Sequence, residues 1–212
     1  MFKHKDQRVG VFIDTQNMYY SARSLFQRKV NFKNIVEDAV AGRRLIRALA
    51  YVVSTKTAEE QPFFDALQKS GIETREKELM EYASGHKKAD WDVGIAIDAI
   101  QMLDVLDVVV IVSGDGDFLP LVQHIQSRGR IAEVMAFGAT TSSSLVNYVD
   151  DYIDLSQNKK RYLIGSVGKG RTGDDKGGQA VTEEDELGEG GFIMEPPPVG
   201  NQNESRTRRL EF

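Results

Sequence analysis

An uninterrupted apolar run, Val108–Val112, most constrains how this chain folds, and it ends in a glycine-rich turn carrying Asp115 and Asp117. A strand with one face in solvent alternates apolar and polar residues, whereas a strand buried on both faces is apolar throughout. The run therefore predicts a central strand of a parallel sheet. Open α/β sheets bind ligands beyond the carboxyl ends of such strands, so the turn is the first candidate site.

A second apolar strand, expected over Val9–Ile13, also ends at a carboxylate, Asp14. Asn17 follows at the start of an expected helix. Asp14 either caps this helix or binds a metal ion, and the two roles are compatible because both place its carboxylate at the end of the strand. Asp115 and Asp117 present a similar choice, since Asp-Gly-Asp is common in turns and Asp117 can cap the next helix.

The rest of the first 158 residues alternates between strand-like and helix-like segments, which predicts an α/β fold with a parallel sheet flanked by helices. Strands are expected at 45–53, 72–79 and 131–137, helices at 17–28, 32–40, 58–69, 90–103, 118–127 and 141–148, and a loop at 81–88.

The expected helix over 90–103 is mostly apolar but carries Asp90, Asp92 and Asp98. Asp90 is a plausible N-cap, and Asp92, in the first turn, can reach the edge of the sheet and suits the helix dipole. At about 100° per residue, Asp92 and Asp98 lie about 120° apart. Asp98 has apolar neighbours, where an unpaired charge is costly, so it either faces the acidic site or pairs with a basic group.

Carboxylates that converge on one edge of a sheet repel each other unless a cation neutralises them. Hard oxygen ligands suit Mg²⁺ or Mn²⁺, so the sequence predicts a metal-dependent phosphodiester enzyme. Ser113 is small enough to let a phosphate approach, and Lys87 and Lys88 either hold a substrate phosphate or form a solvated basic loop. The candidate metal ligands are Asp14, Asp92, Asp98, Asp115 and Asp117.

Composition excludes several other classes of protein. The chain has no cysteine, so it has neither disulfides nor thiolate zinc sites. Its net charge of −5 argues against broad charge-driven binding of nucleic acid. No apolar run approaches the roughly 20 residues that span a bilayer, and the start lacks the apolar stretch of a signal peptide. We therefore expect a cytoplasmic protein with no membrane partner.

The composition changes near Asn158, which divides the chain into an expected domain, 1–158, and a tail, 159–212. The tail holds 10 of the 19 glycines and 3 of the 5 prolines, and we expect it to be disordered because it has little apolar surface to bury. An apolar triplet followed by three prolines, Phe192–Pro198, is either a peptide that binds a protein partner or part of a linker.

Three segments together, 11–17, 88–98 and 112–121, resemble the NYN domain family in its LabA-like bacterial branch, within the PIN-like nuclease superfold. The resemblance covers roughly residues 8–156. It implies a three-layer α/β/α sandwich with a mainly parallel central sheet and metal-dependent cleavage of RNA by an acidic cluster. The matching positions are those of Asp14, Asn17, Asp92, Asp98, Asp115 and Asp117. Asp90-Trp91 before Asp92 departs from the family pattern.

The first hypothesis is thus a Mg²⁺- or Mn²⁺-dependent ribonuclease in which Asn17 orients a ligand or the scissile phosphate, and Lys87 and Lys88 contact the RNA backbone. The second is a noncatalytic RNA-binding or regulatory module on the same fold. Convergence of Asp14, Asp92 and Asp115 within about 4–6 Å would favour the first. A phosphatase with Asp14 as nucleophile ranks last, because position 16 is glutamine.

Overall fold

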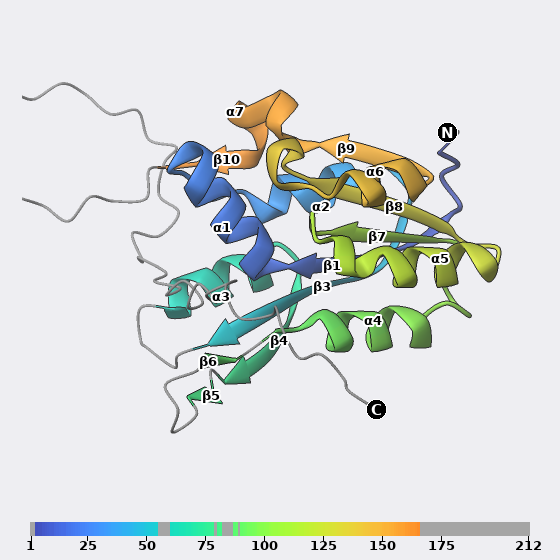
Figure 1. The fold of residues 1–212 in the computed structure, drawn as a ribbon, viewed down its shortest axis with the longest axis horizontal. Helices are drawn as coiled ribbons and strands as arrows, with labels where there is room; N and C mark the ends of the chain where they lie inside the picture. The colour runs from blue at the N-terminus through green and yellow to red at the C-terminus, as the bar shows by residue number, and fades with distance from the viewer. Residues whose placement is uncertain (1–2, 55–59, 79, 82–86, 89, 166–212) are drawn as a thin grey trace, which may run out of the picture.

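A six-stranded sheet forms the centre of the protein (Figure 1). The computed structural model describes residues 3–54, 60–78, 80–81, 87–88 and 90–165. Every neighbouring pair in the sheet is parallel, which confirms the predicted fold class. The strand order is β4-β3-β1-β7-β8-β9, and the strands are β1 (Arg8–Asp14), β3 (Arg44–Ser54), β4 (Glu73–Glu78), β7 (Val108–Val112), β8 (Ile131–Ala136) and β9 (Asp151–Asp154).

Helices flank the sheet and complete the α/β/α sandwich. From β1 the chain moves outward to β3 and β4, and it then returns past β1 to β7 and continues outward on the other side. Because parallel crossovers are right-handed, the reversal places the helices before β4 on one face and the next three helices on the other. The last helix returns to pack against the helices of the first face. The helices are α1 (Thr15–Phe26), α2 (Phe32–Val40), α3 (Gln61–Lys69), α4 (Asp92–Gln101), α5 (Leu119–Ser127), α6 (Ser143–Tyr148) and α7 (Lys159–Tyr162).

The two central strands are the most deeply buried. All five residues of β7 are buried, as are Val9 and Val11 to Ile13 in β1. Burial on both faces explains why these strands are continuous apolar runs. None of the helices in the described residues combines the length and the apolar character needed to cross a bilayer.

Several short elements escaped the sequence reading because they are polar or very short. β9 is a four-residue polar strand at the edge of the sheet. β2 (Lys29–Val30) pairs antiparallel with β10 (Leu163–Ile164), and β5 (Met80–Glu81) pairs antiparallel with β6 (Lys87–Lys88) within the expected loop. Short 3-10 helices form at η2 (Gly116–Phe118), η3 (Gly138–Thr140) and η4 (Leu155–Asn158).

The packed part of the chain continues beyond Asn158, the boundary expected from composition. Arg161 donates from Nε and Nη2 to the carboxylate of Asp38, both at 2.6 Å, and the hydroxyl of Tyr162 donates to Asp38 at 2.7 Å. Tyr162 and Leu163 are buried. Apolar residues 162–164 thus belong to the domain, and the expected segment Phe192–Pro198 lies outside the described residues.

We expect truncation after Asn158 to lower the thermal midpoint of the protein by several degrees. The truncation removes Tyr162 and Leu163, and burying one such side chain is worth about 1.5–3 kcal/mol. Truncation after Gly165 is the matched control, because it keeps α7 and β10 and should leave the midpoint nearly unchanged. Equal midpoints for the two truncated proteins would contradict this assignment.

Candidate metal centre

The site lies at the carboxyl ends of β1 and β7, where the sheet order reverses. Ile13 pairs with Val112 in the parallel register, so the residues that follow, Asp14 and Ser113, are neighbours. The side chain of Asp14 caps α1 by accepting a hydrogen bond from the backbone N–H of Asn17 at 3.0 Å. Its other oxygen accepts from the hydroxyl of Ser113 at 3.3 Å. Asp14 therefore does cap the helix, and it lies at the switch point that binds ligands in open sheets.

Hydrogen bonds hold the turn after β7 against the start of α1. Asn17 Oδ1 accepts from the N–H of Gly114 at 3.0 Å, and Ser113 Oγ accepts from the N–H of Asp115 at 3.2 Å. Asp115 in turn accepts from the N–H of Asp117 at 3.0 Å and caps η2. Asn17 and Ser113 thus position the two acids. Ser113 is fully buried, so its expected contact with substrate is not supported.

The two glycines of the turn allow another loop to approach closely. A Cβ at Gly114 would lie 2.9 Å from the carbonyl oxygen of Thr140, and one at Gly116 would lie 2.9 Å from the hydroxyl of Ser142. The N–H of Ser142 donates to the carbonyl of Gly114 at 2.9 Å. A side chain at Gly114 would push the backbone of the loop away, and one at Gly116 would displace the side chain of Ser142.

Three carboxylates converge beside this turn. Asp92, Asp115 and Asp117 each offer an oxygen, and these oxygens all lie within 4.8 Å of one another. Asp92 and Asp115 are half-buried and Asp117 is exposed. Among the described residues, no basic side chain forms an ion pair with any of the three. This donor set fits a hard divalent cation.

Burial and the charges of neighbouring acids raise the pKa values of Asp14 and Asp92. Burial raises the pKa of Asp14 to about 6, the hydrogen bond from Asn17 opposes the rise, and the charges of Asp92 and Asp115 add to it. The pKa of Asp92 is also raised, first by burial and then by the charges of its acidic neighbours. A bound cation would reverse the effect of the neighbouring charges.

The structure places Asp98 outside the cluster, so it is not retained as a metal ligand. Its carboxylate accepts a hydrogen bond from the hydroxyl of Tyr51 at 2.8 Å and lies 3.5 Å from Nε of Arg75. Its position round the helix from Asp92 turns it toward these partners. Of the two expected alternatives, pairing with a basic group is the one observed.

Two further sequence expectations have different outcomes. Asp90 is not the N-cap of α4, because Trp91 occupies that position and makes no side-chain cap. Lys87 and Lys88 make up the short strand β6, but the structure does not describe their side chains. Their contact with RNA remains a prediction.

Trp91 is a positioning residue that the sequence reading missed. Its indole N–H donates to the carbonyl of Val52 at 3.0 Å, and its ring packs against Tyr51 with the centroids 5.3 Å apart. A Cβ at Gly94 would lie 2.5 Å from the Trp91 ring. Trp91 thus attaches the start of α4 to β3, which sets the position of Asp92. The available signal was the single tryptophan directly before an acid of the expected site.

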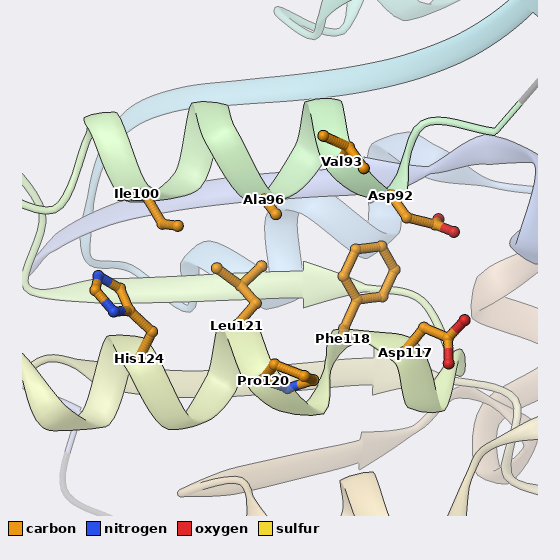
Figure 2. A pocket seen from close by; sticks show the side chains of 9 residues that line it. All are labelled: Asp92, Val93, Ala96, Ile100, Asp117, Phe118, Pro120, Leu121 and His124. Carbon is orange, nitrogen blue, oxygen red and sulfur yellow. The ribbon is translucent and has the colours of Figure 1, made fainter.

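A shallow groove between α4 and α5 opens at the cluster (Figure 2). Its volume is about 360 Å³, and its lining is mostly apolar. Asp92 and Asp117 face each other at one end beside the ring of Phe118, and His124 lies at the opposite end. His124 is therefore remote from the carboxylates.

We expect Asp14→Asn to stabilise the metal-free protein at neutral pH. Because the pKa of Asp14 is raised on folding, the folded state binds the proton more tightly, and stability falls as the pH rises from about 4 to about 6. The ionised carboxylate then costs roughly 1–3 kcal/mol at pH 7. Asparagine retains the N-cap without the charge.

Thermal unfolding in a chelator, followed from pH 4 to pH 8, tests this expectation. The midpoint of Asp14→Asn should exceed that of the wild type at pH 7, and the difference should disappear below about pH 4. Asp14→Ala is the control for the cap, because it loses both the charge and the hydrogen bond from Asn17. A lower midpoint for Asp14→Asn at pH 7 would show that the ionised carboxylate stabilises the fold.

Known proteins resemble this chain over the same region. The family model of the NYN domain matches residues 8–156 of this chain. The low amplitude and bright protein LabA of Synechococcus elongatus (strain ATCC 33912 / PCC 7942 / FACHB-805) is 29% identical over 164 residues, which cover 72% of this chain and 86% of LabA. The crystal structure of a protein of unknown function from Vibrio parahaemolyticus RIMD 2210633 superposes with a TM-score of 0.70 and is 28% identical. The superposed region covers 77% of this chain and 100% of the Vibrio chain.

The matched region contains β1, α4, β7 and the turn after it, and so includes every residue of the acidic cluster. The similarity to LabA agrees with the branch that the three sequence segments indicate. The chain belongs to the NYN domain family, and its LabA-like character is supported by that relative.

Proposed function

We propose that this protein is a metal-dependent ribonuclease. The observation that carries the proposal is the convergence of Asp92, Asp115 and Asp117 within 4.8 Å at the reversal point of a parallel sheet. The start of α4 and the glycine turn after β7 carry these three acids. Membership of the NYN family supports RNA as the substrate.

Asp92, Asp115 and Asp117 would hold Mg²⁺ or Mn²⁺, and Asp14 is linked to Asp115 through Ser113. Such an ion lowers the pKa of a bound water and stabilises the charge that develops on the phosphate. Asp14 reaches the cluster through Ser113, whose hydroxyl donates to Asp14 and accepts from the N–H of Asp115. The chain's own contribution is therefore to hold four acids in place before the substrate arrives, so that little reorganisation is needed.

Asn17 acts through the turn in this proposal. Its side-chain oxygen is engaged by the N–H of Gly114, so it orients Asp115 and Asp117 by fixing the backbone that precedes them. This is a narrower role than the expected contact with the scissile phosphate.

A noncatalytic RNA-binding module is the second candidate. The convergence expected of an enzyme is met by Asp92 and Asp115, whereas Asp14 is not a member of the group within 4.8 Å. The charges of Asp92 and Asp115 nevertheless act on Asp14, which supports a shared site. The cytoplasmic location and a protein partner for Phe192–Pro198 remain predictions.

We expect Asp115→Asn to reduce RNA cleavage by about 100-fold or more, because the carboxylate helps to hold the ion that contributes several kcal/mol of transition-state stabilisation. The measurement is cleavage of end-labelled single-stranded RNA with Mg²⁺, with Mn²⁺ and with a chelator. Asp98→Asn is a matched control, since it makes the same chemical change on α4 outside the cluster and should retain cleavage.

Thermal midpoints of both variants would show that they are folded. Undiminished cleavage by a folded Asp115→Asn protein would overturn the proposed chemistry. A wild-type protein that binds RNA but leaves it intact with either metal would favour the noncatalytic module.

A further inference from the structure

A basic corner forms where α7 and β10 pack against the end of α1 and β2. The guanidinium Nε of Arg28 donates to the carbonyl of Gly165 at 3.1 Å. The ammonium of Lys159 lies 4.7 Å from the centroid of the Phe26 ring. Cations from opposite ends of the domain sequence are thereby brought together, which the sequence does not reveal.

Neighbouring side chains anchor the backbone of α7, which carries Lys159 and Lys160. Arg161 binds both carboxylate oxygens of Asp38, and Tyr162 donates to the same group. Asp38 is thus already neutralised by Arg161. Among the residues that the structure describes, neither Lys159 nor Lys160 forms an ion pair.

A stripe of side chains along α1 connects this corner to the metal centre. Tyr19, Arg23 and Phe26 are spaced i, i+4 and i+7, so they lie within about 60° of one another round the helix. The Arg23 guanidinium carbon lies 5.9 Å from the centroid of the Tyr19 ring, and its Nη1 donates to the Tyr19 hydroxyl at 3.2 Å. Asp14 is the N-cap of this helix, and Arg23 lies about 14 Å farther along its axis.

We propose that this stripe, extended by Lys159 over the ring of Phe26, binds the backbone of single-stranded RNA on one side of the acidic cluster. Alternating cations and an aromatic ring are typical of surfaces that bind single strands without reading their sequence. The protein carries a net charge of −5, and its acidic cluster repels phosphate, so an RNA strand needs local cations to stay bound. The inference rests on the proposed function for its ligand, and it adds the path that the strand takes.

The test compares two double variants of the full chain that lose the same charge. Arg23→Gln/Lys159→Gln removes two cations of the stripe. Arg44→Gln/Lys69→Gln removes two exposed cations at the start of β3 and the end of α3. Both lie near the amino ends of the strands, away from the acidic cluster at the carboxyl ends. The probe is a fluorescent, unstructured RNA of about 12 nucleotides, and anisotropy gives its affinity in a chelator over a range of salt concentrations.

We expect the stripe variant to bind RNA more weakly and its slope of log K against log salt to fall by about 1.4, the value for two lost phosphate contacts on a single strand. The control variant should keep the wild-type slope. In the presence of metal, the stripe variant should raise KM for RNA with little change in kcat.

Each other outcome bears on the inference separately from the enzyme activity. An unchanged slope in the stripe variant overturns it, even when the wild type cleaves RNA. Tighter RNA binding by the stripe variant overturns it too, and would indicate that these cations hold an acidic segment of this chain such as Glu183–Glu186. If the stripe variant has a smaller salt slope but the wild type never cleaves RNA, the stripe is supported and only the nuclease proposal is overturned. A wild type that binds no RNA overturns both.

Discussion

The parallel pairing of β1 with β7 is the interaction on which the rest of the site depends. The two strands are neighbours at the point where the sheet order reverses, and their register brings Asp14 beside Ser113. Helices leave from both strand ends on opposite faces, so no crossover covers this edge of the sheet. The same burial that makes both strands apolar therefore leaves their acidic ends open to a ligand.

Holding acids together has an energetic cost, and the surrounding contacts offset it. Burial and mutual repulsion raise the pKa values of Asp14 and Asp92, which opposes ionisation at neutral pH. Hydrogen bonds from Asn17 and Ser113 to Asp14 favour its charged form. A divalent cation would remove the remaining repulsion, so metal binding and stability of the charged site are linked.

In the proposed nuclease, the acidic cluster and the basic corner have separate tasks. Without a bound cation the acids repel a phosphate backbone, so cations elsewhere on the surface help to capture RNA. α1 links the two regions, because its first residue follows Asp14 and its last turn meets Lys159. Its buried face packs on the sheet while Tyr19 and Arg23 follow its partly exposed face, so one helix both fixes the metal centre and leads away from it.

The sequence by itself determined the fold class and the central acids. Val108–Val112 and Val9–Ile13 could be recognised as buried parallel strands because burial on both faces leaves no polar position, and an acid directly after such a strand has only one edge of the sheet to occupy. Local chemistry also made Asp14 a candidate cap of the following helix, beside its candidate role as a metal ligand. These inferences depend on residues close together in the chain, where periodicity and cap preferences act.

Only the tertiary structure decided the matters that depend on contacts between distant segments. The choice between metal and ion pair at Asp98 was made by Tyr51 and Arg75, which come from β3 and β4. The packing of residues just beyond Asn158 was decided by Asp38, which accepts hydrogen bonds from Arg161 and Tyr162. Helical and strand periods carry no information about such partners, because a side chain's pairing energy depends on which elements the sheet order brings beside it.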